Sequence, residues 1–153
     1  MTLARLGRHA DAELAIKAAL KLGLEPPSAE LRYDRALVQA LADDHQAAVA
    51  EAVEVADAPE VTGREMQGLA AACALSAAAT VRDESTPAGE RSDLHEQYCL
   101  RAIELLRRAE QRGQFRAPEA IDQLSQNPDF AQLHSRDDFK MLISELRTTL
   151  HLE

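Results

Sequence analysis

Runs of alanine dominate this sequence and restrict the folds that it can adopt. The segments "LAAACALSAAAT" at 69–80 and "HQAAVAEAVEVADA" at 45–58 are the clearest of them. Alanine is the best helix former and lets helices approach closely. It buries little area per residue, so a core built from it gains stability from many small contacts. Aromatic residues make up only 3% of a chain that is 46% hydrophobic, and the sequence therefore predicts an all-α fold.

Small polar residues mark the expected helix starts. Ser28 precedes a periodic stretch that runs to about Ala42, and Thr62 with Glu65 forms a capping box for a helix to about Thr80. Such side chains accept hydrogen bonds from the free N–H groups of the first turn. The other expected boundaries are Ser92 and Ser135 as helix starts, Gly113 as a left-handed helix end, and Asn127-Pro128 as a cap followed by proline.

The chain shows self-similarity at an interval of 36 residues. This shift places His9 on His45 and Ala36 on Ala72, and small residues recur where paired helices must cross closely. The interval then lengthens by 18 residues, and we expect the polar stretch from Thr80 to Asp93 to form a loop insertion. The expected organisation is one domain, 1–153, with a partial repeat at 1–25, a repeat at 26–59, a repeat at 60–113 that contains the insertion 80–93, and a C-terminal cap at 114–153.

The charge and cysteine content exclude several functions. The net charge of −9 disfavours a nucleic-acid binder, because phosphate contacts need basic surface. One local exception is a group of arginines, for which a solvated helix face is favoured over a docking patch for an acidic partner. Its members are Arg101, Arg107, Arg108, Arg112 and Arg116. Two cysteines, no apolar run of spanning length and no secretory signal pattern predict a cytoplasmic location.

The residues that could carry chemistry form no reactive arrangement in the sequence. His95 and Cys99 lie four residues apart, but zinc needs three or four ligands and no second pair has matching spacing. Helix packing or solvent exposure is therefore favoured for this pair, and a core position is expected for His9 and His45. We assign no catalytic residue, metal or cofactor. An all-helical metal-binding protein or enzyme is the less favoured alternative.

Several stretches resemble the tetratricopeptide repeat. In "LGRHADAELAIKAAL" at 6–20, Gly7 takes the place of the turn glycine, and Ala12, Ile16 and Ala19 match the small-large-small series. The stretches "ADDHQAAVAEAVEVA" at 42–56 and "AIELLRRA" at 102–109 match in part. Arg32 and Arg35 depart from the pattern, since they stand where the family has apolar residues. The resemblance implies a right-handed superhelix of antiparallel helix hairpins, a TPR-like α-solenoid.

The end of the chain carries the more specific resemblance. The stretch "NPDFAQLHSRDDFKMLISEL" at 127–146 is similar to the tail that follows the last repeat in some bacterial serine/threonine protein kinases. It implies a C-terminal capping helix pair, in which Phe130 and Phe139 cover the apolar end of the last hairpin. Terminal repeats need such an apolar inner side and a polar outer side. No kinase motif is present in the chain.

The resemblance also implies a concave inner face lined by the first helix of each hairpin. The residues that it places there are Tyr33, Leu37, Ala40, Met66, Leu69, Cys73 and Ser76. None of them is the Lys, Arg or Asn with which some relatives hold a terminal carboxylate, so an apolar or helical segment is the expected guest. The equal alternative is that neighbouring repeats fill this face.

These observations favour a non-catalytic module for protein–protein or peptide interaction, expected within a larger bacterial regulatory or signalling protein such as a serine/threonine kinase. A structural spacer is the alternative. The chain is expected to begin inside a repeat, which would leave an apolar N-terminal end open to self-association. The polar stretch 80–93 offers Ser85 and Thr86 as phosphoacceptors, and a disordered linker is the favoured alternative for it.

Overall fold

The fold consists of consecutive α-helices. The computed structural model describes residues 14, 18, 22 and 29–152, and no strand occurs among them. Its elements are α2 (Ala29–Leu41), α3 (His45–Ala56), α4 (Gly63–Arg82), α5 (Ala88–Gln111), α6 (Pro118–Gln126), the short 3-10 helix η2 (Pro128–Phe130) and α7 (Asp137–Leu152). The all-α prediction is confirmed. Apart from residues 14, 18 and 22, the expected partial repeat at 1–25 lies outside the described residues, and so do His9 and the expected cap at Ser28.

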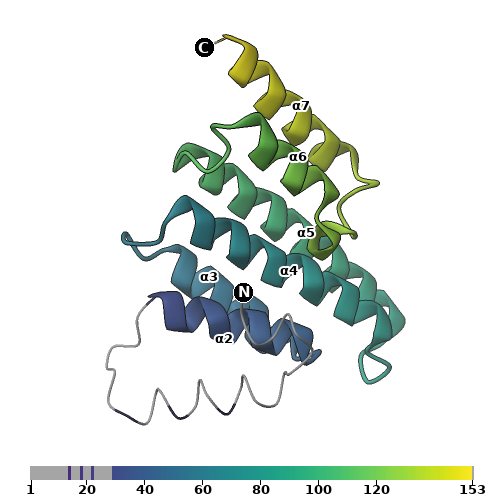
Figure 1. The fold of residues 1–153 in the computed structure, drawn as a ribbon. Helices are drawn as coiled ribbons and strands as arrows, with labels where there is room; N and C mark the ends of the chain where they lie inside the picture. Colours follow the sequence, from purple (N-terminus) through teal and green to yellow (C-terminus); the bar gives the residue numbers. More distant parts are fainter. Residues whose placement is uncertain (1–13, 15–17, 19–21, 23–28, 153) are drawn as a thin grey trace.

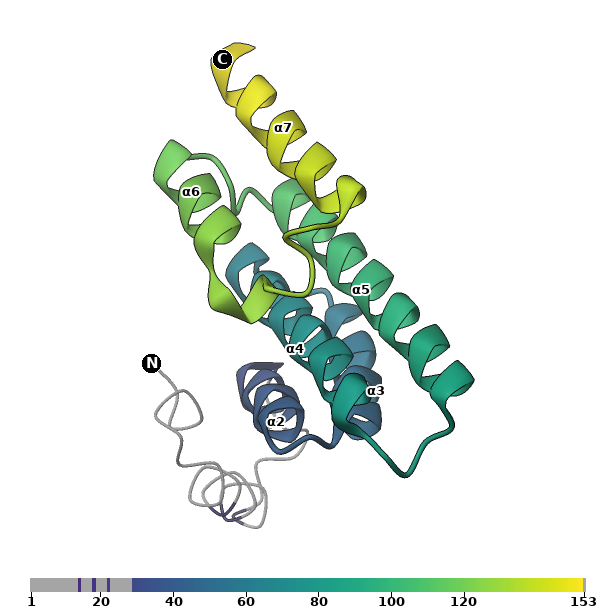
Figure 2. The ribbon, with the colours of Figure 1, turned by 90° about the vertical axis from the view of Figure 1, so that its right-hand side faces the viewer.

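The helices form two layers (Figures 1 and 2). Helices α2, α4 and α6 lie in one layer and α3, α5 and α7 in the other, and each helix runs antiparallel to the next along the chain. Direct packing joins α2 to α3, α3 to α4, α4 to α5 and α6 to α7. Packing within the layers joins α2 to α4 and α5 to α7. Helix α3 packs against α2 and α4 of the other layer, and η2 packs against both α4 and α6.

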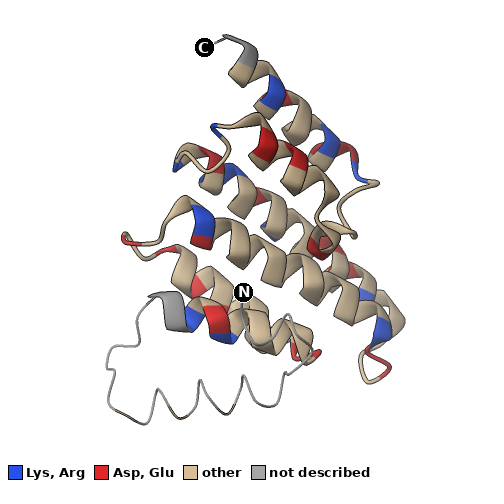
Figure 3. Ribbon diagram, in the orientation of Figure 1, with Lys and Arg blue, Asp and Glu red and all other residues tan. Residues whose placement is uncertain are grey.

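Helix α4 is the centre of the core. It packs against α2, α3, α5 and η2, and it carries no charged residue between Glu65 and Arg82 (Figure 3). Its alanines are buried on several sides of the helix, together with Met66 and Leu69. A helix that is apolar all round belongs inside a protein. The alanine run thus lets one helix contact several others at short distance.

The closest approach between α2 and α4 occurs at a glycine. A Cβ atom added to Gly68 would lie 2.1 Å from Cε2 of Tyr33, well inside van der Waals contact. The aromatic ring therefore occupies the space that any other residue at position 68 would fill. Glycine is the only residue that accommodates this packing without a shift of the ring.

Two of the expected helix caps are confirmed, as is the left-handed glycine. The backbone N–H of Glu65 donates to Thr62 Oγ1 at 3.2 Å, and the N–H of Thr62 donates to Glu65 Oε2 at 2.7 Å. Asn127 caps η2 by accepting a hydrogen bond from the backbone of Asp129 at 3.0 Å. Gly113 has φ of 79° after the end of α5. These local signals were strong because each depends on neighbouring residues alone.

The expected loop insertion at 80–93 is wrong. Helix α4 continues to Arg82 and α5 begins at Ala88, so only residues 83–87 connect them. The expected start at Ser92 is also wrong, because Pro87 precedes the first turn and its carbonyl accepts from the N–H of Arg91 at 2.9 Å. The additional residues lengthen the pair: α4 and α5 have 20 and 24 residues, against 13 and 12 in α2 and α3. The last helix likewise begins at Asp137, two residues beyond Ser135.

The C-terminal aromatic residues are buried, as expected. Phe130 is fully buried and Phe139 is 3% exposed, and their rings stack with centroids 6.4 Å apart. Leu133 and Leu142 are fully buried beside them in the same apolar cluster. Since η2 also packs against α4, this cluster joins the last helices to the centre of the core.

Candidate interaction surface

The predicted inner-face residues lie in the core. Leu37, Ala40, Met66, Leu69, Cys73 and Ser76 are all 0–2% exposed, and only Tyr33 is partly exposed. The prediction that these side chains line an open groove is therefore wrong. Helical spacing finds a stripe of apolar residues that faces other helices, but it cannot separate a groove from a contact between helices. The alanine-lined contacts close this face, as the alternative interpretation held.

The two arginines that depart from the repeat pattern have a structural explanation. Glu51 of α3 is 9% exposed and lies between two guanidinium groups of α2. Arg32 Nε donates to Glu51 Oε1 at 2.6 Å, and Arg35 Nη2 donates to Glu51 Oε2 at 2.5 Å. The hydrogen bond with Glu51 is also the main reason that the pKa of Arg32 is raised. A buried carboxylate with such partners is compensated by opposite charge and hydrogen bonds.

Two arginines at the end of α5 bind the turn between α3 and α4. Arg108 donates to the carbonyl oxygen of Ala56 and pairs with Asp57 at 3.2 Å. Arg112 donates to the carbonyl oxygen of Val61. These carbonyls lie at and beyond the C-terminus of α3, where the helix dipole favours cations. The arginines therefore hold the turn against α5.

Ion pairs also join α5 to α7. Arg107 Nη1 lies 2.7 Å from Glu145 Oε2. Arg136, just before α7, donates to both oxygens of Glu96 at 2.6 and 2.9 Å, and its Nε donates to Asp138 at 3.0 Å. The bonds to Glu96 and then Asp138 raise the pKa of Arg136, and the bond to Arg136 lowers the pKa of each carboxyl group. Bidentate geometry makes this pair specific in position.

The arginine cluster is thus neither a fully solvated face nor a free docking patch. Arg107, Arg108 and Arg112 all make contacts outside their own helix. Arg101 pairs with Glu104 within α5 at 2.6 Å, and Arg116 is exposed beyond the helix. The sequence showed the cluster but not the carbonyl and carboxylate groups that the fold brings to it.

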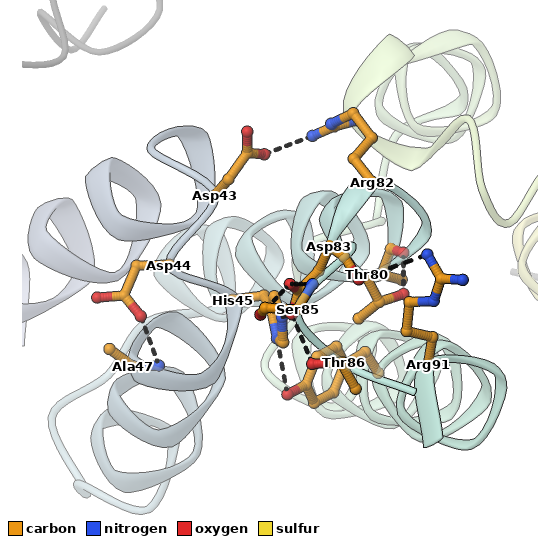
Figure 4. Close-up of polar contacts among 12 residues, drawn as sticks. Asp43, Asp44, His45, Ala47, Thr80, Arg82, Asp83, Ser85, Thr86 and Arg91 are labelled. Carbon is orange, nitrogen blue, oxygen red and sulfur yellow. Dashed lines mark hydrogen bonds and ion pairs between the residues drawn. The ribbon is translucent and has the colours of Figure 1, made fainter. Parts of the chain in front are cut away.

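The short connection between α4 and α5 is organised by one carboxylate (Figure 4). Asp83 accepts hydrogen bonds from the backbone and the hydroxyl of Ser85 and, at 2.7 Å, from Thr86 Oγ1. Its Oδ2 also lies 3.1 Å from His45 Nε2. The bonds from Ser85, Thr86 and His45 lower the pKa of Asp83. The connection is therefore tied to both α4 and α3.

His45 is buried, as the sequence predicts. It is 5% exposed, and its Nδ1 lies 3.3 Å from the hydroxyl oxygen of Tyr98 on α5. The two ring centroids are 5.8 Å apart. With Asp83 on the other nitrogen, the imidazole joins three elements of the core. These two partners explain how a polar side chain is accommodated in the core.

The two expected phosphoacceptors lie in this connection. Ser85 is exposed and Thr86 is half-buried, and the hydroxyl of each donates to Asp83. The segment is thus a bonded turn, and the expected linker does not extend through 80–93. Their modification stays a prediction.

The pair His95 and Cys99 is held by structural contacts. His95 Nδ1 lies 2.9 Å from the carbonyl oxygen of Ala77, and its Nε2 lies 3.7 Å from Cys99 Sγ. Burial raises the pKa of the Cys99 thiol and raises that of Cys73 to about 12. Within residues 29–152, no three potential ligands come together to hold a metal ion. Both thiols are protonated at neutral pH, so neither is an activated nucleophile.

A cleft between α6 and α7 was not found by sequence reasoning. It has a volume of about 410 Å³ and is lined by Ser125 of α6, His134 of the connection and α7. The lining part of α7 includes Phe139 and Ile143 together with Lys140 and Arg147. The residues come from three segments, so no single motif marks the cleft.

Comparison with family models, curated proteins and solved structures found no match to this chain. In the part of the chain that the structure describes, no helix combines the length and the hydropathy needed to cross a membrane.

Proposed function

We propose that the chain is a non-catalytic helical-repeat module for protein–protein or peptide interaction. The two-layered stack of antiparallel helices is the observation that carries this proposal. We further propose that its pairs continue as a right-handed, TPR-like superhelix closed by α6, η2 and α7. Stacked helix pairs present long continuous surfaces, which suit the binding of extended partners.

The chemistry of the described side chains supports a non-catalytic role. The lowered pKa of Asp83 and the raised pKa values of Arg136 and Cys73 have structural causes, namely turn hydrogen bonds, an ion pair and burial. Perturbed groups that serve an active site gather in an accessible cleft. These groups instead hold together helices and a turn.

A structural spacer is the second candidate, and the burial of the predicted inner face favours it. A spacer needs a rigid stack and no receptor surface. For either role we propose a setting within a larger bacterial regulatory or signalling protein, such as a serine/threonine kinase. The similarity of the last segment to kinase-associated repeat tails supports that setting.

Site-specific photo-crosslinking distinguishes a receptor from a spacer. Leu100 and Met141 are 50% and 57% exposed on α5 and α7, so a photoreactive amino acid at either position leaves the core intact. A receptor yields one discrete cross-linked partner, which binds the purified chain saturably with a Kd of about 1 μM or tighter, as specific complexes do. A chain that gives the same products with and without illumination contradicts the interaction module and favours the spacer.

A further inference from the structure

The cleft between α6 and α7 has the size and composition of a binding site. Its volume of about 410 Å³ falls within the roughly 300–1,000 Å³ that is typical of ligand pockets. Phe139 and Ile143, which are 3% and 8% exposed, give it an apolar side. Lys140 and Arg147 provide cations, and no carboxylate belongs to the lining.

The cations of the cleft are available to a ligand. Lys140 Nζ lies 3.6 Å from Asp137, whose side chain is 98% exposed, so this pair is weak. Arg147 uses Nη2 to bind Asp122 at 3.0 Å, which leaves its other N–H groups. A ligand carboxylate therefore displaces only a loose surface contact when it binds here.

The hydroxyl groups of the cleft can accept hydrogen bonds from a ligand, whereas its cations can only donate them. Ser125 donates its hydroxyl hydrogen to the carbonyl of Asp122, and Thr148 donates to that of Ser144, each at 2.9 Å. With their hydrogens engaged inside the helices, both oxygens keep lone pairs that accept from a ligand N–H. A simple inorganic anion has no such donors, whereas a peptide backbone has one at each residue except proline.

His134 adds an unpaired polar atom. Its Nε2 is buried and makes no hydrogen bond, and its ring lies against Phe139 with centroids 5.9 Å apart. A buried polar atom without a partner is unfavourable.

We propose that this cleft binds a short acidic peptide segment in which a carboxylate side chain adjoins an apolar one. The carboxylate pairs with Lys140 and Arg147, the peptide N–H groups donate to Ser125 and Thr148, and the apolar side chain packs on Phe139 and Ile143. This inference rests on the proposed interaction function and specifies its ligand. The cleft lies apart from the expected inner-face groove, and its proposed ligand is acidic, whereas an apolar or helical segment was expected for the groove.

Fluorescence anisotropy of two labelled peptides tests the proposal on the full chain. The probes are Leu-Glu-Leu-Glu-Leu-amide, with the fluorophore on its N-terminal amine, and its counterpart with Gln in place of Glu. We expect saturable binding of the acidic probe and binding of the Gln probe that is about tenfold weaker, as for loss of charge pairing in a partly exposed site. Amide shifts in NMR spectra should change at Ser144 and Thr148 on binding.

Two charge-reversal variants locate the effect. Lys140→Glu should weaken binding of the acidic probe about tenfold or more. Arg101→Glu is the matched control, since Arg101 pairs with Glu104 of the same helix and lies outside the cleft, and it should leave binding unchanged. Lys140→Ala, which adds no negative charge, should give an intermediate loss, and circular dichroism checks that each variant keeps its fold.

Three results would overturn the inference. They are equal binding of the two probes, equal losses in the Lys140→Glu and Arg101→Glu variants, and displacement of the peptide by inorganic phosphate at equal concentration. If a cross-linked partner binds the Lys140→Glu variant as tightly as the original chain, the cleft is not its site. The proposed interaction function then stands without this ligand.

Discussion

Single residues set the spacing between helices in this fold. Gly68 meets the ring of Tyr33, and Glu51 is enclosed by Arg32 and Arg35. At Gly68 the ring of Tyr33 on α2 fills the space that the missing side chain on α4 leaves, whereas Glu51 of α3 is held by hydrogen bonds and opposite charge. A large residue set against a small one keeps the contact between α2 and α4 closely packed.

Gly68→Ala should destabilise the chain. Its methyl group would enter the space of the Tyr33 ring, and overpacking of this kind costs about 1–3 kcal/mol, more than the gain in helix propensity. The control is Gly89→Ala, because a Cβ there meets nothing within 4 Å and should stabilise α5 by up to about 1 kcal/mol. Urea denaturation measures both. Equal and stabilising effects of the two variants would show that Tyr33 does not restrict position 68.

The carboxylate of Asp83 should make stability depend on pH. Its folded-state pKa is lowered by bonds from Ser85, Thr86 and His45, so its contribution is present above the unfolded pKa of about 3.9. The contribution is lost as pH falls from there through the folded pKa. Asp83→Asn should therefore lower the urea midpoint at pH 7, and the difference from the original chain should shrink toward pH 3.

Asp137→Asn is the control for this measurement. Its carboxylate is 98% exposed and forms a weak ion pair with Lys140 at 3.6 Å, so the midpoint should stay unchanged. The difference in urea midpoint between Asp83→Asn and the original chain could instead stay constant from pH 7 to pH 3. That result would contradict a stabilising role for the ionised carboxylate.

At the scale of elements, local signals and tertiary contacts differ in how well sequence reveals them. The capping box at Thr62 and the left-handed Gly113 were predictable, because they depend on a few adjacent residues. The continuation of α4 and α5 into the polar stretch was not predictable from its polarity, because solvent-facing turns of a helix are polar too, and Pro87 stands at the start of α5, where proline is tolerated. The cleft was missed because it joins Ser125, His134 and α7.

Thr62→Ala should weaken the start of α4. It removes the hydroxyl that accepts from the N–H of Glu65, and loss of an N-cap costs about 1 kcal/mol. Thr149→Ala is the matched control, because its hydroxyl bonds only to the carbonyl of Glu145 on the exposed face of α7. Thermal unfolding should show a lower Tm for Thr62→Ala alone. Similar Tm shifts in both variants would mean that the capping box does not stabilise α4.

At the scale of the whole molecule, the contacts link each helix pair to the next. Arg108 and Arg112 connect α5 back to the α3–α4 turn, while Arg107 and Arg136 connect it forward to α7. Phe130 then joins the last elements to the cluster around α4. A stack with mainly neighbour-to-neighbour contacts should open from its ends, whereas a compact bundle should unfold as one unit.

Phe139→Ala distinguishes these two behaviours. Removing a buried phenylalanine costs about 3–5 kcal/mol, and in a stack this loss falls on α6, η2 and α7. Amide hydrogen exchange should therefore speed up strongly in residues 118–150 and much less in α2 and α3. Met141→Ala, a change on the exposed face of the same helix, should leave both regions protected. Equal acceleration from α2 to α7 would mean that the chain is a single cooperative bundle, because end-to-end coupling of that strength is incompatible with independent opening of its last layer.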